Sequence, residues 1–228
     1  YLSVDPGDMR ALGALGEIYI EQKNLKGALQ VYERLGEVTP DDLAVGIRIA
    51  LLRYDLNDHE GALAAFNRML RDYPASDKII YYLAVIYENL RRYEDAGGRF
   101  AEITTKSPFY ADARLHLAFV QEAAGHPDAA AATLVEAIRS QPTSGPFYEY
   151  LASIYEKQGR IPDAVALLNQ GVGVLPDNER LRYSMGMLLE RHGRSDAAIA
   201  QMRQVLRINP NNAYALNFIG YTYAERGL

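Results

Sequence analysis

The chain has 228 residues, a formal net charge of −5 and no cysteine. A net negative charge disfavours nucleic-acid binding, which needs a basic surface, so no nucleic-acid partner is expected. Without cysteine the chain has no disulfides, thiolate metal sites or cysteine nucleophiles. Hydrophobic residues make up 49% and charged residues 23%, as in folded domains, and no apolar run approaches the ~18 residues that suggest a membrane-spanning helix.

Prolines mark a regular period along the chain. Of the 10 prolines, one set recurs every 34 residues: Pro6, Pro40, Pro74, Pro108, Pro142, Pro176 and Pro210. The other three, Pro127, Pro146 and Pro162, are each predicted to stand in the first turn of a helix, where proline loses no hydrogen bond. A fixed period of this length indicates an array of structural repeats.

Each period is predicted to hold two helices. Apolar residues recur at i, i+3, i+4 and i+7, which is one face of a helix, and a break separates two such faces. The breaks lie near Lys23, Asn57, Arg91, Gly125, Gly159, Gly193 and Gly227. In chain order we expect the end of a truncated repeat at 1–6, full repeats at 7–40, 41–74, 75–108, 109–142, 143–176 and 177–210, and the first helix of a truncated seventh at 211–228. Asp58, Ser76 and Ser195 are predicted N-caps.

Two columns of small residues accompany the period. Twelve residues before each closing proline stand Ala28, Ala62, Ala96, Ala130, Ala164 and Ala198, and twenty-four before it stand Gly16, Ala50, Ala84, Ala118, Ala152, Gly186 and, in the last repeat, Gly220. We expect these residues where the paired helices approach most closely, because a larger side chain there would push the axes apart.

Together with Tyr19, Tyr87, Tyr155 and Tyr223 of the first helices and Tyr32, Phe66 and Phe100 of the second, these columns resemble the tetratricopeptide repeat over nearly the whole chain. The resemblance implies an all-α fold, a right-handed superhelical α-solenoid of antiparallel helix pairs whose first helices line a concave groove. The chain departs from the pattern at Arg53 and Gln121, which replace an aromatic residue, and at Gly46, Arg114 and Arg182, which replace a hydrophobic one. Looser packing is expected there.

Glycines also interrupt two of the predicted second helices. Gly97 and Gly98 fall in the third repeat, and Gly171 and Gly173 in the fifth. Each is expected to cost about 0.5–1 kcal/mol relative to alanine. Close packing or local fraying is the first interpretation of these glycines, and a functional hinge is the alternative.

No constellation for catalysis, metal binding or cofactor binding is present. The histidines, His59, His116, His126 and His192, form no i, i+4 pair, and no nucleophile stands with a base in a known motif. We therefore expect no enzymatic activity and no cofactor or metal ion.

The first helices carry a second stripe beside the packing face, and the resemblance implies that it lines the groove. Its residues are Ile47, Leu51, Tyr54, Tyr81, Val85, Glu88, Leu115, Phe119, Glu122, Glu149, Ser153, Glu156, Tyr183, Met187, Glu190, Asn217 and Tyr221. The middle is apolar, as suits burial of a partner's side chains. Glu88, Glu122, Glu156 and Glu190, again 34 apart, form a glutamate ladder that either pairs with a partner's basic residues or is a solvated face.

These features predict a protein-interaction scaffold that binds a peptide or protein segment, apolar with basic residues, in its groove. A structural spacer that self-associates end to end, and the non-catalytic region of a larger enzyme, stay open as alternatives. The chain lacks an initiator Met and its end repeats are incomplete, so we expect a slice of a longer solenoid. Residues 211–227 resemble repeats of bacterial cell-envelope proteins, so a bacterial origin is expected, with cytoplasm and envelope both open.

Overall fold

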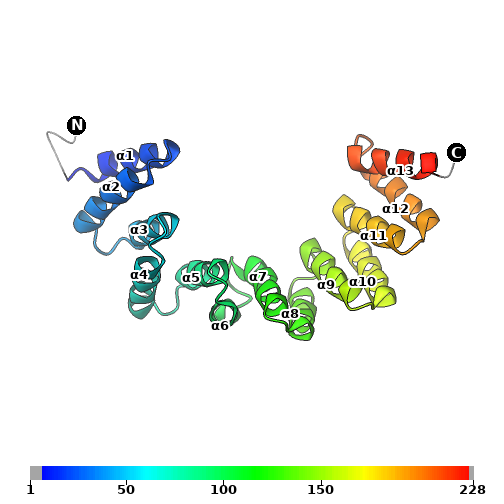
Figure 1. Cartoon of the computed structure of the whole chain (residues 1–228), viewed down its shortest axis with the longest axis horizontal. Coiled ribbons are helices and arrows are strands. Elements are labelled where there is room, and N and C mark those ends of the chain that lie inside the picture. Colours follow the sequence, from blue (N-terminus) through cyan, green and yellow to red (C-terminus); the bar gives the residue numbers. More distant parts are fainter. Residues whose placement is uncertain (1–6, 226–228) are drawn as a thin grey trace. The chain divides into compact units, whose positions relative to one another are not determined.

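The computed structural model describes residues 7–225, and within them the chain forms α-helices and no strand, which confirms the all-α prediction (Figure 1). The helices are α1 (Met9–Glu21), α2 (Leu25–Val38), α3 (Leu43–Asp55), α4 (His59–Asp72), α5 (Asp77–Asn89), α6 (Tyr93–Glu102), α7 (Tyr110–Ala123), α8 (Pro127–Ser140), α9 (Gly145–Lys157), α10 (Ile161–Val174), α11 (Glu179–Arg191), α12 (Ser195–Ile208) and α13 (Ala213–Glu225). None of these described helices is long and apolar enough to cross a membrane.

The helices belong to two compact units that divide between Ile103 and Thr104. The first unit holds α1 to α6 and the second holds α7 to α13. Within each unit the predicted helix pairs pack together: α1 with α2, α3 with α4, α5 with α6, α7 with α8, α9 with α10, and α11 with α12. Each pair also packs against the next pair of its own unit. The exact repeat boundaries stay a prediction.

Most of the predicted helix starts are confirmed. Asp58 caps α4 by accepting a hydrogen bond from the Gly61 N–H at 2.9 Å, and the three additional prolines lie in the first turns of α8, α9 and α10. Ser76 is the N-cap of α5, although its side chain makes no capping bond. The prediction for Ser195 is wrong by one residue. The Arg194 carbonyl already accepts from the Ala198 N–H at 3.0 Å, so Arg194 is the N-cap and Ser195 the first helical residue.

The predicted breaks between paired helices share one backbone conformation. In the described part of the chain, each break residue has a positive φ: Lys23 (57°), Asn57 (66°), Arg91 (59°), Gly125 (87°), Gly159 (75°) and Gly193 (71°). Gly227 lies outside the described residues. Only glycine adopts this left-handed region without a steric cost, so the first unit places less suitable residues there than the second.

This difference predicts opposite effects of two substitutions. Lys23→Gly is expected to raise the free energy of unfolding by about 0.5–1 kcal/mol, because the relief of left-handed strain exceeds the entropy that glycine adds to the unfolded chain. Gly125→Ala is expected to lower it by about 1 kcal/mol for the reverse reason. Urea unfolding followed by circular dichroism measures both, and changes of the same sign would contradict this explanation.

The small-residue columns lie at the helix contacts, as predicted. The second-helix alanines, Ala28 and its equivalents, are 0% exposed throughout. A Cβ added to Gly16 would come within 2.6 Å of the Tyr32 ring, and one added to Gly186 would come within 2.6 Å of Met202 Cε. Gly220 differs, since nothing lies within 4 Å of its added Cβ.

The interrupting glycines have different environments. A Cβ on Gly171 would lie 2.9 Å from Cγ of the buried Tyr148 ring, so close packing is the correct interpretation there. Added Cβ atoms on Gly98 and Gly173 would meet nothing within 4 Å. Helix α6, which contains Gly97 and Gly98, has 10 residues, whereas the other second helices described have 14. Its early end is what weak helix propensity at two consecutive glycines produces.

The polar replacements of the aromatic column find polar partners. Arg53 Nη2 forms an ion pair with Glu33 Oε1 at 2.8 Å, which joins α3 to α2. Gln121 Oε1 accepts a hydrogen bond from Thr133 Oγ1 at 2.8 Å, which joins α7 to α8. The two departures from the pattern therefore retain a contact between helices, made by hydrogen bonds in place of ring packing.

Candidate functional site

The first helices of successive repeats contact one another in the second unit. Helix α9 packs against both α7 and α11, in addition to its own partner α10. Between α9 and α11 lies an open cavity of about 290 Å³, here called the α9–α11 cavity. It is lined by Glu149, Ala152, Ser153, Glu156, Leu168, Tyr183, Ser184, Met187, Leu188 and Arg191.

The cavity brings together residues that the sequence analysis assigned to the groove. Five of them line it: Glu149, Ser153, Glu156, Tyr183 and Met187. Sequence reasoning missed Ser184 and Arg191. The signal that could have found Arg191 is its place 35 residues after Glu156, one helical position beyond the period.

The other predicted groove residues lie elsewhere, with varied exposure. Ile47 is 4% exposed and belongs to the core of the first unit, not to a surface. Phe119 on α7 is 45% exposed, and Tyr221 on α13 is 67% exposed. Asn217 is also exposed. The half-buried ones are Leu51, Tyr54, Tyr81, Val85, Glu88, Leu115, Glu122 and Glu190.

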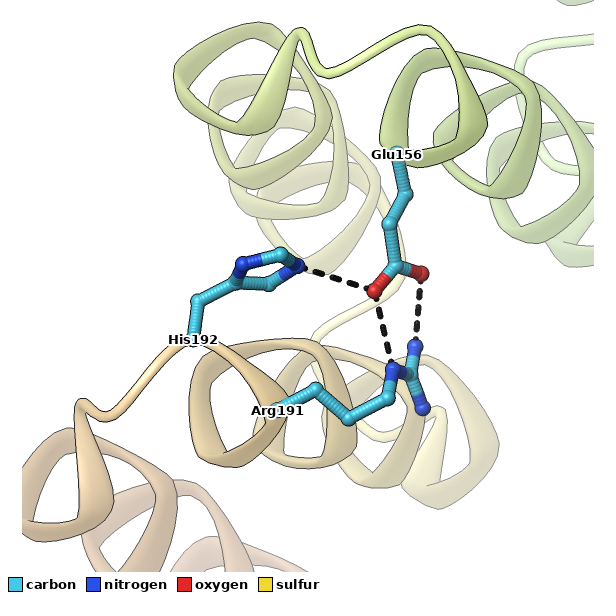
Figure 2. Close-up of polar contacts among 3 residues, drawn as sticks. All are labelled: Glu156, Arg191 and His192. Atoms are coloured by element: carbon cyan, nitrogen blue, oxygen red, sulfur yellow. Dashed lines mark hydrogen bonds and ion pairs between the residues drawn. The ribbon is translucent and has the colours of Figure 1, made fainter.

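Glu156 is held by two side chains from the end of α11 (Figure 2). Arg191 donates from Nε to Oε1 at 2.8 Å and from Nη2 to Oε2 at 2.7 Å, a bidentate pair. His192 Nε2 lies 3.0 Å from Oε1. The hydrogen bonds from Arg191 lower the pKa of Glu156, and the same contact raises the pKa of Arg191. The carboxylate therefore stays ionised and fixes α9 against α11.

Glu122, another member of the glutamate ladder, has the same kind of contact. It accepts a hydrogen bond from Lys157 Nζ at 2.6 Å and another from the Tyr150 hydroxyl at 3.0 Å. Lys157 stands 35 residues after Glu122, as Arg191 does after Glu156. These two glutamates thus pair with a cation one repeat later in their own chain. The positions 35 residues after Glu88 and Glu190 hold Ala123 and Glu225, which are not cations.

Glu149 lies deeper in the α9–α11 cavity than its ionic partner. Its side chain is 13% exposed, whereas that of Arg180, whose Nε lies 2.8 Å from Glu149 Oε2, is 75% exposed. The Ser184 hydroxyl donates to Glu149 Oε1 at 3.4 Å. Burial raises the pKa of Glu149, and this effect exceeds the opposing influence of Arg180 and Ser184. A largely buried carboxylate whose partner is solvated can exchange that partner.

The two carboxyl groups predict opposite pH dependences of stability. The folded pKa of Glu156 is below its ordinary 4.5, so its contribution is present above pH 4.5 and lost as pH falls through the lowered value. The folded pKa of Glu149 is above 4.5, so its contribution is present below pH 4.5 and lost as pH rises through the raised value.

Relative to wild type, we therefore expect Glu149→Gln to gain stability as pH rises above 4.5. Glu156→Gln is expected to lose relative stability as pH rises toward 4.5 from below. Urea unfolding at a series of pH values measures both differences. If the free energy of unfolding of each variant changed with pH in parallel with that of wild type, the pKa of neither carboxyl group would be shifted by folding.

The cavity offers both apolar and polar binding contacts. In the described part of the chain, no group of three or more acidic and histidine side chains is arranged to hold a metal ion. Tyr183 and Met187 supply apolar contact area, and Glu149 and Ser153 supply polar groups beside it. Such a mixture suits the side chains of a protein segment.

Comparisons with known proteins support the fold. Family models described as tetratricopeptide repeat match residues 1–41, 47–111 and 183–228, and residues 122–188. No curated protein sequence matches.

Solved structures of similar fold include PilF of Pseudomonas aeruginosa, with 17% identity, 93% of this chain and 97% of that chain covered, and a TM-score of 0.62. The MamA protein has 21% identity over 75% of this chain and 93% of that one, with a TM-score of 0.56. YrrB, described as a TPR protein with an unusual peptide-binding site, has 17% identity over 82% and 96%, with a TM-score of 0.52. At these identities the likeness concerns the fold alone.

Proposed function

The chain belongs to the tetratricopeptide repeat family, whose fold generally mediates protein–protein interaction, and on that premise we propose that it is a non-catalytic scaffold that binds a peptide or protein segment in the α9–α11 cavity. The observation that carries the proposal is the convergence of Tyr183, Met187 and Glu149 on one cavity between two first helices. The other predicted groove residues, which lie in the first unit, on α7 and α13 and, for Glu190, on α11, stay predictions.

The apolar part of the cavity suits a partner's side chain. Tyr183 and Met187 are half-buried and pack on the core cluster of Met202, Val205 and Ala215. Aromatic residues and methionine are enriched at protein interfaces, because tyrosine offers a large rigid surface and methionine adapts to different shapes. The proposed ligand therefore presents at least one apolar side chain.

The charged residues of the cavity indicate that the ligand also presents a basic residue beside its apolar side chain. We assign recognition to Glu149, because its present partner Arg180 is 75% exposed and a lysine or arginine of the ligand could replace it. Glu122 and Glu156 already bind cations of their own chain, so we assign them to the alignment of successive repeats. The peptide-binding site in the description of YrrB gives a precedent for this kind of ligand within the fold.

The proposal is tested with peptides selected from a random displayed library on the immobilised chain. Met187→Glu is expected to weaken binding of a selected peptide at least about tenfold, a change of about 1.4 kcal/mol, because it places an unpaired charge in the apolar part of the cavity. Val174→Glu is the matched control, since Val174 is 41% exposed on α10 and outside the cavity lining. Equal affinity of Met187→Glu and wild type, with helicity retained, would refute the site.

A further inference from the structure

The first unit contains a larger cavity on the side of its second helices. It measures about 560 Å³ and opens between α2, α3 and α4, and we call it the α2–α4 pocket. It is lined by Glu33, Gly36, Glu37, Thr39, Pro40, Asp41, Asp42, Leu43, Val45, Gly46, Ile49, Arg53, Ala65, Arg68, Met69, Asp72 and Tyr73. The volume is within the range, about 300–1,000 Å³, of cavities that hold ligands.

Two glycines, Gly36 and Gly46, line this pocket at positions where the other repeats have larger residues. The column of Gly36 holds Leu70, Thr104, Ile138, Val172 and Leu206 in the other repeats, and the column of Gly46 holds Leu12, Ile80, Arg114, Tyr148, Arg182 and Leu216. Larger residues therefore occupy both positions everywhere else in the chain.

Backbone geometry does not require either glycine. Both lie within helices, α2 and α3, and neither has a positive φ. A Cβ on Gly36 would lie 3.1 Å from Ile49 Cδ1, and one on Gly46 would lie 3.0 Å from Met69 Sδ, which are the far ends of flexible side chains. A helical glycine costs about 0.5–1 kcal/mol relative to alanine, so each of the two glycines lowers the stability of its helix.

The walls of the pocket are apolar and its rim is acidic. Val45 and Ala65 are buried, and Ile49 and Met69 are half-buried beside them. On the rim, Glu33 pairs with Arg53, and Asp42 caps α3 by accepting from the Ala44 and Val45 N–H groups.

Three further carboxylates of the rim make no ion pair among the described residues: Glu37, Asp41 and Asp72. All three are exposed, and Arg68 is the remaining basic residue of the lining. The rim therefore carries an excess of negative charge around an apolar interior. That combination attracts a segment with positive charges around an apolar side chain.

We propose that the α2–α4 pocket is a second interaction surface, which takes a leucine-sized apolar side chain from a lysine- or arginine-rich segment of a partner protein. That side chain would pack against the apolar walls of the pocket, and the flanking cations would face Glu37, Asp41 and Asp72. The surface lies on α2, α3 and α4, so it does not depend on the site proposed for the second unit.

A direct test uses three fluorescein-labelled peptides in fluorescence polarisation. The first has a leucine pair at i, i+4 flanked by lysines, the second has alanine in place of leucine, and the third has glutamate in place of lysine. Wild type is expected to bind the first at least about tenfold more tightly than either of the others. Affinity is expected to fall as salt concentration rises. No saturable binding of the first peptide up to about 1 mM would overturn the proposal.

Variants then locate the binding. Two variants are each expected to weaken binding of the first peptide at least about tenfold. One is Gly36→Leu, which fills the pocket, and the other is the double charge reversal Glu37→Lys with Asp72→Lys, which keeps the pocket open. Gly98→Ala, whose added Cβ meets nothing within 4 Å, is the control and is expected to bind as wild type. Full affinity in the charge-reversed variant would overturn the proposal. Loss of affinity in Met187→Glu would also overturn it, because that result would place the peptide in the α9–α11 cavity.

Discussion

Replacement of Tyr148 by alanine is expected to lower the free energy of unfolding by about 3–5 kcal/mol, the usual effect of removing a large buried ring. Tyr148 is 0% exposed, its hydroxyl donates to the Pro142 carbonyl at 2.9 Å, and its ring occupies the space that Gly171 leaves open. Tyr148→Phe, which removes only the hydroxyl, is expected to cost about 0.5–1.5 kcal/mol. Urea unfolding followed by circular dichroism measures both.

In another repeat, the positions equivalent to Tyr148 and Gly171 hold a small and a large residue in the opposite order. Gly46 and Met69 stand 102 residues before Tyr148 and Gly171, and there the first position is small and the second large. Gly171→Met alone is therefore expected to destabilise the second unit by about 1–3 kcal/mol through overpacking. Combined with Tyr148→Ala, it should restore part of the lost stability. If the two effects were simply additive, the two sites would not compensate each other in the core.

Reversal of charge at Glu156 has the second largest expected effect. Glu156→Lys places a cation against Arg191 and His192, and it is expected to cost about 1–3 kcal/mol, between the limits for exposed and buried pairs. The matched reversal Arg191→Glu in the same chain should recover about half of that loss, because it restores one pair of opposite sign.

Glu136→Lys is the control for this pair, because Glu136 and Arg139 form an ion pair in which the side chains are 64% and 70% exposed. It is expected to change stability by no more than about 0.5 kcal/mol. A loss of the same size at Glu136 and Glu156 would mean that the bidentate contact adds nothing beyond general surface charge.

Much of the fold could be predicted from the sequence because the same residue types recur at the same positions of successive repeats. A single glycine or alanine says little, whereas Ala28 and its equivalents at a fixed spacing define one buried face. The breaks were located for the same reason. The N-cap at Ser195 was misplaced because a hydroxyl before an apolar run does not reveal which residue first departs from helical φ and ψ. That depends on the turn that follows Gly193.

The candidate site could be predicted only in part. Helical spacing placed Glu149, Tyr183 and Met187 on one stripe, and all three line the α9–α11 cavity. The ion pairs depend on the stagger between neighbouring helices, and a stagger of one residue puts Arg191, not Glu190, opposite Glu156. Ile47 was predicted on the same stripe, yet it is buried. The α2–α4 pocket was not foreseen, because Gly46 was interpreted as loose packing and Gly36 was not singled out.

The central claim, a protein-binding site between α9 and α11, is tested most directly by photo-crosslinking. A benzoylphenylalanine at position 153, inside the cavity, is compared with one at position 174, outside it, using a peptide selected on the wild-type chain. We predict an adduct from position 153 that excess unlabelled peptide abolishes, and no such adduct from position 174. Specific crosslinking from position 174 alone would contradict the claim, because it would place the ligand on the second helices.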